Sequence, residues 1–389
     1  MELLGIIPGP IGPHRDSINS ILELIVDQFV EMYDPGVYIA RTARHPHGRR
    51  VEGALQISVN DLPAARQTSG FASHSHTHCC HLCRITIQDL DNLDMDTWVS
   101  RVWELDRQFA FAWKNATSIA ERERLYQLYG IRYSPIQRLS YCNVIICTVL
   151  DVMHMFIEGL FPTHVRKIFG MDAEVADGEG AATFVGHRSS EVDFVAGFSV
   201  LQWGTDAKLE GLKVNRMAEV YHDMSNLLLP SSMQAAPKTV GTRKGGKLKA
   251  ASWETLVLVH LPVTLIRLWG SASSGSRERQ ILDNFMHLVK AVRLALLPCM
   301  THDIVSSYLS EMLLYLRTLL QLFPGTSITI YQHLALHLPI LLAEHGPTQA
   351  WRCWVVERMN YVLQTLKTNN KFGAPNHSFA SDLYSFTTR

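Results

Sequence analysis

The feature that most constrains this fold is a long helix-patterned region that separates two parts of different character. From about residue 95 to 345, apolar residues recur at intervals of three and four, and strand signals fade. A structureless loop of that size is uncommon inside a compact domain. The sequence therefore predicts three parts: a strand-containing part at 1–94, a helical region at 95–345 and a final helix within 346–389.

The first part carries both strand and helix signals. A short apolar run at 3–9 ends in a Pro/Gly turn, which is typical of a strand, and the apolar spacing over 17–33 predicts a helix. Two more strands are expected at 36–41 and 52–60, on either side of the turn-like HPHGRR. Asp61 closes the second of them. Because strands and helices are both expected, the chain as a whole is predicted to be an α/β protein.

Composition excludes a protein that is basic over its whole surface. The chain has 389 residues, 47% of them hydrophobic, with 36 Lys and Arg against 36 Asp and Glu. This length and hydrophobic content are enough to bury a substantial core. Because the formal charges balance, any affinity for nucleic acid must come from local patches.

Neither secretion nor membrane insertion is expected. The N-terminus MELLGIIPGP has no basic start and meets two prolines before an apolar stretch reaches signal-peptide length. The apolar run at 255–269 is shorter than a bilayer span and is interrupted by a His, a Pro and an Arg. Seven cysteines, three of them clustered beside histidines, favour reduced thiols or metal ligands in an intracellular setting.

Two carboxylates, Asp61 and Glu357, lie where a folded chain could use them in catalysis. Asp61 ends a predicted strand, and Glu357 lies on a final helix expected from about 351 to 371. Two-metal phosphoryl transfer needs acidic side chains that hold two divalent ions, Mg²⁺ or Mn²⁺, about 4 Å apart. The same residue types are also typical of a helix cap at Asp61 and of a surface ion pair between Glu357 and Arg358.

A compact Cys/His cluster, SHSHTHCCHLCR, occupies 73–84. Cys80 and Cys83 have the two-residue gap that lets two thiolates bind one tetrahedral ion, which suggests a structural zinc. One CxxC is half of such a site, so nearby histidines or a distant residue such as His154 would have to complete it. Reduced cysteines in a turn beside a His-rich loop are the alternative.

A second His pattern lies far along the chain. HLALHLP puts His333 and His337 at the i, i+4 spacing with which two imidazoles on a helix can hold a metal. No Glu lies between them as in a zinc peptidase, and packed or capping histidines are the favoured interpretation.

One local segment is strongly basic. KTVGTRKGGKLKAASW has no acidic residue, and its glycines would let the backbone approach a phosphate chain. Its composition alone favours a solvated linker. The candidate DNA contacts in and around it are Arg243, Lys244, Lys247 and Lys249, with Lys238 at its start.

Taken together and in this order, several strings resemble the transposase-like proteins of basidiomycete fungal relatives of CACTA (En/Spm) and Kyakuja-Dileera-Zisupton DNA transposons. The strings are GIIPGP, PGVYIARTARHPHGRRVEGAL, NDLPAARQTSGFASHS, CHLC, DVMHMFIEGL, GKLKAASW, HLALHLP and ERMNYVLQTLKTNN. They extend from residue 5 to residue 370, so the resemblance covers most of the chain.

The resemblance implies an RNase H-like DDE catalytic core, interrupted before its last acidic residue by a large all-helical insertion. Asp61 resembles the second catalytic carboxylate of the family and Glu357 the third. The CxxC resembles a presumed metal-binding element, for which the DxMH pattern offers Asp151 and His154 as partners. The family usually has Phe and Gly after its ERFNG-type Glu, whereas this chain has Met359 and Tyr361.

The family's first catalytic Asp lies upstream of the PGP turn, and this chain begins just before that turn. We therefore expect an incomplete core from a transposase that cut and joined DNA with metal ions, inactive in this copy. The implied partner is DNA in the nucleus, with a homo-oligomer as a further possibility and no membrane or small-molecule substrate. A non-catalytic module that binds DNA or protein is the alternative, and a decayed sequence is the third hypothesis.

Overall fold

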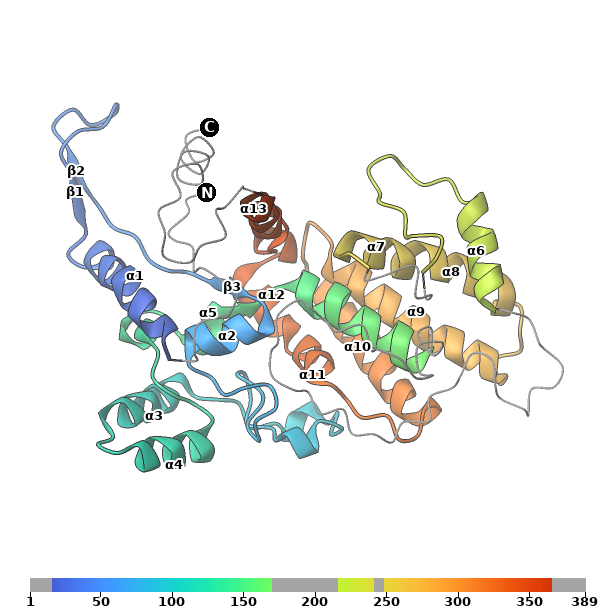
Figure 1. Ribbon diagram of the computed structural model, residues 1–389, viewed down its shortest axis with the longest axis horizontal. Helices are drawn as coiled ribbons and strands as arrows, with labels where there is room; N and C mark the ends of the chain where they lie inside the picture. The colour runs from blue at the N-terminus through green and yellow to red at the C-terminus, as the bar shows by residue number, and fades with distance from the viewer. Residues whose placement is uncertain (1–15, 170–215, 241–247, 366–389) are drawn as a thin grey trace.

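The computed structural model describes residues 16–169, 216–240 and 248–365 (Figure 1). Helices predominate in these residues, and the strands are short. The α-helices are α1 (Ile18–Tyr33), α2 (Leu62–Ser69), α3 (Trp103–Asn115), α4 (Ile119–Tyr129), α5 (Val144–Cys147), α6 (Arg216–Asn226), α7 (Ala250–Thr255), α8 (Leu261–Trp269), α9 (Arg277–Ala295), α10 (His302–Leu322), α11 (Ile330–Leu336), α12 (Leu338–His345) and α13 (Trp354–Thr365).

The remaining elements are short strands and helical turns of other types. The strands are β1 (Val37–Ile39), β2 (Arg49–Val51), β3 (Ser58–Asn60) and β4 (Thr148–Leu150). The π-helices are η4 (Met153–Leu160), η5 (Thr163–Ile168) and η8 (Leu256–His260), and the 3₁₀ turns are η1 (Ile87–Asp89), η2 (Met95–Thr97), η3 (Pro135–Arg138) and η9 (Thr348–Ala350). Together they confirm a mixed α and β protein that is mostly helical.

The first two strands form an antiparallel hairpin, in which Val37 pairs with Val51 and Ile39 with Arg49. The second strand of this hairpin therefore begins inside the segment that the sequence assigned to the turn. A left-handed Gly48, with φ of 78°, closes the turn and lets pairing start with the next residue. Of the strand expected at 52–60, only β3 is present.

A parallel pair lies at the centre of the α/β part. β3 and β4 run side by side, with Val59 opposite Val149, and the amide of Asp151 donates to the carbonyl of Asn60 at 2.9 Å. Parallel pairing needs a crossover connection, and here α2 to α5 supply it. The helical region expected over 95–345 is thus not all-helical, because it contributes β4. The carboxyl ends of both strands reach one edge, where Asp61 and Asp151 follow.

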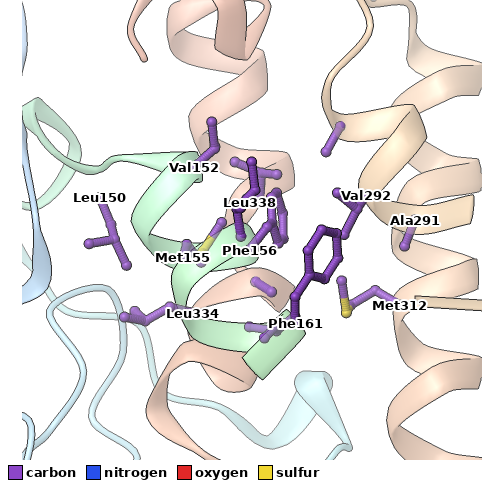
Figure 2. Close-up of a cluster of buried hydrophobic side chains, with 14 of the residues drawn as sticks. Leu150, Val152, Met155, Phe156, Phe161, Ala291, Val292, Met312, Leu334 and Leu338 are labelled. Carbon is purple, nitrogen blue, oxygen red and sulfur yellow. The ribbon is translucent and has the colours of Figure 1, made fainter. Parts of the chain in front are cut away.

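The hydrophobic core joins this strand pair to the helical body (Figure 2). Leu150 at the end of β4 is followed by η4, whose Phe156 is fully buried among side chains of the later helices. Figure 2 shows Leu334 of α11 and Leu338 of α12 beside the residues of η4, and Phe161 directed toward Val292 of α9 and Met312 of α10. Since burying a side chain of this size contributes about 2 kcal/mol, the residues of η4 are held firmly.

One helical stretch passes the length and composition test for a membrane span. It is the run Ala250–Trp269 across α7, η8 and α8, with 56% of its most apolar window buried inside the protein. The apolar segment is therefore longer than the sequence indicated. Its residues Leu256, Val257, Leu261 and Leu265 are fully buried, whereas Val263 and Ile266 are exposed.

Other expectations have mixed outcomes. The helix expected at 17–33 is confirmed by α1, and the final helix expected at 351–371 is α13, which begins at Trp354. The expected strand at 3–9 lies outside the described residues. The three-part division at 94 and 345 stays a prediction.

Candidate functional site

Four buried side chains form a cluster that could hold a metal ion. Cys80, Cys83, His333 and His337 are all buried, and one ligand atom from each lies within 4.8 Å of all the others. The Nε2 atom of His333 lies 3.3 Å from the Sγ atom of Cys83 and 3.2 Å from the Nε2 atom of His337. Among the described residues, no other group of three or more His, Cys, Asp or Glu side chains brings its ligand atoms this close together.

The cysteines are held by a short loop after α2. The amide of Leu82 donates to the Sγ atom of Cys80 at 3.3 Å, as in a turn that wraps around a thiolate. The amide of Arg101 donates to the Leu82 carbonyl at 3.0 Å, and the backbones of Cys83 and Ser100 pair in an isolated antiparallel β-bridge. The backbone around both thiols is therefore fixed by hydrogen bonds to the strand-like segment that follows η2.

Two buried arginines donate hydrogen bonds to backbone carbonyls of the same loop. Arg66 donates to the carbonyl of Cys79 at 2.7 Å, and Arg101 donates to the carbonyl of Cys80 at 2.9 Å. Arg101 also pairs with the fully buried Asp106 at 3.1 Å. Burial lowers the pKa of Arg66 to about 10, although the neighbouring thiols oppose this shift.

The histidines come from a short helix of the later region. A capping box starts α11: the Thr329 hydroxyl accepts from the amide of Gln332, and the Gln332 side chain accepts from the amide of Thr329. His333 lies on α11, and His337 ends it one turn later. The ring of Trp98 packs against both imidazoles, with centroids 4.5 and 5.1 Å away, and shields them from water.

The geometry fits a tetrahedral ion. Zinc bound at about 2.0–2.1 Å to nitrogen and about 2.3 Å to sulfur places two imidazole nitrogens about 3.3 Å apart, and a nitrogen and a sulfur about 3.6 Å apart. The observed separation of the two nitrogens, 3.2 Å, is close to the first value, and the observed 3.3 Å between nitrogen and sulfur is shorter than the second. Two facing Nε2 atoms in a dry site need a proton or a cation between them, and two thiols beside the same point provide the further ligands that a cation would need.

The protonation of the thiols also favours a cation. Burial raises the pKa of Cys80, but the hydrogen bond from Cys83 and the imidazoles of His337 and His333 lower it more, and the net shift is well below the ordinary thiol value. The same hydrogen bond, followed by burial, raises the pKa of Cys83. Formation of the Cys80 thiolate is therefore favoured, and an ion bound here would displace the proton of Cys83.

The structure distributes the histidines differently from the sequence interpretation. His154, suggested as a partner of the CxxC pair, lies elsewhere and contacts carboxylates. His81, between the two cysteines, directs its Nε2 atom to the carbonyl of Thr148 at 3.2 Å, and burial lowers its pKa to about 3. His333 and His337, which the sequence favoured as packed or capping residues, are packed and buried, and they also lie where they could serve as ligands to an ion held by the two cysteines. Their i, i+4 spacing was the signal.

The second candidate site is the edge where the parallel strands end. Asp61 follows β3 and is half-buried, and its Oδ1 atom accepts from the amide of Ala64 at 2.7 Å. The alternative interpretation as a helix cap is therefore present in the structure. One carboxylate oxygen caps α2, and the other remains for a further partner.

Asp151, after β4, links three elements. It is fully buried, and its Oδ1 atom accepts from the amide of Cys353 at 2.7 Å, just before α13. Its Oδ2 atom lies 2.9 Å from the Nδ1 atom of His154. Asp151 thereby fixes the start of α13 and directs the other ring nitrogen of His154 outward.

Glu357 on α13 reaches the same place. Its Oε1 atom lies 3.8 Å from the Nε2 atom of His154, although the two residues are far apart in the sequence. Burial raises the pKa of Cys353 to about 12, and the charges of Asp151, Glu357 and Asp61 act in the same direction. Asp61 and Glu357 thus both raise the pKa of one thiol. The direct approach of these two carboxylates to each other stays a prediction.

His154 lies at the centre of this second candidate site, the acidic end, which consists of Asp61, Asp151, His154 and Glu357. Burial lowers its pKa, but the hydrogen bond and charge of Asp151, with the charges of Glu158 and Asp61, raise it more, so that the net shift is upward. Within the described chain, the carboxylates and His154 do not form a group as close as the Cys/His cluster. The arrangement favours positive charge but is more open than a preformed metal site.

The basic segment can be followed only in part. Arg243, Lys244 and Lys247 lie outside the described residues. Lys249 is exposed and precedes α7, and Lys238 is exposed as well. The prediction that this segment contacts DNA stays a prediction.

Comparison of the chain with protein-family models gives no match, and comparison with curated proteins gives none either. The candidate function therefore depends on the geometry of the residues themselves.

Proposed function

We propose that this protein derives from a DNA transposase with an RNase H-like core, and that the acidic end is what remains of its phosphoryl-transfer site. The observation that carries the proposal is the parallel pair β3 and β4, with Asp61 and Asp151 at its carboxyl edge and Glu357 brought beside His154 by α13. Carboxylates at one edge of a sheet and on a facing helix suit the binding of Mg²⁺ or Mn²⁺ against a phosphodiester.

The proposed partner is DNA, and the proposed place of action is the nucleus. The resemblance assigns two of the three carboxylates that a DDE site uses, Asp61 and Glu357. DNA binding is therefore the activity that we expect to be strong, and metal-dependent cleavage the one that we expect to be weak. The helical region would serve as the insertion that separates the two carboxylates in sequence.

The Cys/His cluster is proposed to bind a structural zinc ion. Its four ligands are all buried, which is typical of closed structural sites, whereas catalytic zinc sites keep an open position. The ion would tie α11 to the loop after α2. Because α11 also packs on η4, the ion would help to hold His154 and Glu158 in place.

The test is a plasmid assay with the whole protein. Supercoiled DNA is incubated with Mn²⁺, Mg²⁺ or a chelator, and nicking and binding are both measured. Asp61→Asn should lower any metal-dependent nicking by about 100-fold, because a ligand to the ions is lost. Asn can still cap α2, so the fold should survive this change. The matched control is Asp303→Asn, at an exposed position on α10.

One observation favours the second candidate, a DNA-binding module without catalysis. Among the described residues, the carboxylates of the acidic end do not form a close set of metal ligands. Salt-sensitive DNA binding that is unaffected by Asp61→Asn, with no nicking in any metal, would favour this module. A protein that neither binds nor nicks DNA would contradict both candidates.

A further inference from the structure

The β1–β2 hairpin is a projecting ribbon. All six of its strand residues are exposed. Figure 1 shows the hairpin and its connecting loop extending beyond α1, away from the helical body. Two exposed strands contribute little to a hydrophobic core, so stability of the fold does not explain why the chain builds them.

The ribbon is the part of the described chain where positive charge is most concentrated for its length. Residues 35–51 contain four arginines and two histidines and no acidic residue, in a chain whose formal net charge is zero. These residues are Arg41, Arg44, His45, His47, Arg49 and Arg50, and all are exposed. The ribbon is therefore a local patch of the kind that DNA affinity requires in a protein with balanced charge.

The cations at the tip are not neutralised by acidic neighbours. At the base of the ribbon, Arg50 pairs with Glu52 at 3.0 Å. Nearer the tip, Arg49 contacts the ring of His45 at 3.1 Å, and Arg41 and Arg44 make no ion pair with any described acidic residue. Three guanidinium groups thus remain available to an external anion.

Hydrogen bonds fix the backbone at the tip of the ribbon. Thr42 and His45 exchange backbone hydrogen bonds of 3.1 and 3.3 Å, and the hydroxyl of Tyr38 donates to the carbonyl of His47 at 2.7 Å. A Cβ atom at Gly48 would lie 2.5 Å from that hydroxyl, so this position needs glycine. Because the turn is fixed, the three arginines are presented with little loss of backbone entropy on binding.

We propose that the tip of this ribbon binds the phosphate backbone of double-stranded DNA through Arg41, Arg44 and Arg49. This inference rests on the proposed function and adds the place of contact. The planar guanidinium group matches a phosphate with two parallel hydrogen bonds, and a two-stranded ribbon fits the major groove. The chain leaves β2 at Val51 and enters β3 at Ser58, so the ribbon leads directly to the edge that carries Asp61.

The test compares two triple variants of the whole protein. Binding to a random duplex of about three helical turns is measured by fluorescence anisotropy over a series of salt concentrations. Arg41→Ala/Arg44→Ala/Arg49→Ala should weaken binding at least about tenfold and reduce the slope of log K against log salt by about 2.7, since each phosphate contact contributes about 0.9. The control variant removes the same charge from other exposed positions, Arg124, Arg293 and Arg317.

A second set of variants separates charge from folding. Changing the three tip arginines to lysine keeps the charge, so the salt slope should stay close to that of the natural protein, while the loss of the two parallel hydrogen bonds should weaken binding less than alanine does. Circular dichroism and the melting temperature should be the same for all variants, because the ribbon is exposed.

The outcomes are distinct. If the tip variant binds DNA as well as the natural protein, or if the control variant loses as much affinity, the ribbon is not the contact and the proposal is overturned while DNA binding stands. The same holds if the ribbon instead mediates concentration-dependent self-association in sedimentation and the tip variant keeps its DNA affinity. If the natural protein itself binds no duplex, the proposed function fails together with this inference.

Discussion

The Cys/His cluster and the acidic end differ in how completely the folded chain has assembled them. In the cluster, all four side chains are buried and their ligand atoms lie within 4.8 Å of one another. At the acidic end, Asp151 is buried and bonded, Asp61 and His154 are half-buried, and Glu357 is exposed. The first is closed around one point, and the second opens to solvent around a histidine.

This difference indicates that the Cys/His cluster suits a structural role, whereas the acidic end suits the binding of a ligand. A closed set of soft ligands excludes water and substrate and needs only an ion to be complete. An open set of carboxylates is costly to bring together without a cation, since like charges repel, and it leaves room for a ligand. The molecule thus combines one closed centre with one open centre, and α11 packs on η4 between them.

Removing a ligand of the closed centre should have the largest effect. Cys83→Ser should lower the free energy of unfolding by most of the contribution of the ion, on the order of 10 kcal/mol for structural zinc, and so prevent stable folding. Thermal melting with and without a chelator, together with zinc determination by mass spectrometry, checks this. Cys299→Ser is the control, because Cys299 is exposed. Equal melting temperatures for both variants, with no bound zinc, would rule out a metal centre.

A change at the buried member of the open centre should have an intermediate effect. Asp151→Asn keeps the shape but weakens the bonds to His154 and to the amide of Cys353, so we expect a loss of roughly 2–4 kcal/mol in stability. Asp61→Asn should cost less than about 0.5 kcal/mol, since Asn caps a helix equally well. Urea unfolding of the two variants measures both values. If Asp61→Asn proves the more destabilising, our division into a structural and a functional carboxylate is wrong.

The pH dependence of His154 should give the smallest effect. Its pKa is raised in the folded state above the ordinary 6.5, so protonation stabilises the fold. This stabilisation is fully present below pH 6.5 and is lost as the pH rises through the folded pKa. The stability difference between the natural protein and His154→Gln should therefore shrink from pH 5.5 to pH 8.5. NMR titration of the ring gives the folded pKa directly, and a value below that of a free histidine would contradict the proposed field of carboxylates.

The helices followed from the sequence more reliably than the strands. The apolar spacing of α9 and α10 corresponds to one buried face on each helix, and the spacing of α1 was also enough to predict that helix. β4 is only three residues long and sits between an α-helix and a π-helix, and what makes it a strand is pairing with β3 from far upstream. Such a strand is fixed by tertiary contact, so its local pattern carries little signal.

The candidate sites show the same limit. Cys80 and Cys83 stood out because their spacing lets both thiolates reach one ion. Their partners did not, because the spacing of His333 and His337 is equally common in packed helices, and only the fold brings the two pairs together. Asp151 was visible only through the DxMH resemblance, and its role as a link between β4 and α13 depends on Cys353, which no motif marked.

The separation between Cys83 and His333 has a consequence for how the chain folds. An ion shared by these residues closes a loop of 250 residues, and closing a flexible loop of that length costs roughly 5 kcal/mol of chain entropy. The proposed zinc ion would therefore not start the folding of this protein by joining the two ends of this loop. It should be captured late, after the helices have brought the two ends of the loop together, and zinc supplied to the unfolded chain should instead trap neighbouring thiols and imidazoles in pairings that slow refolding.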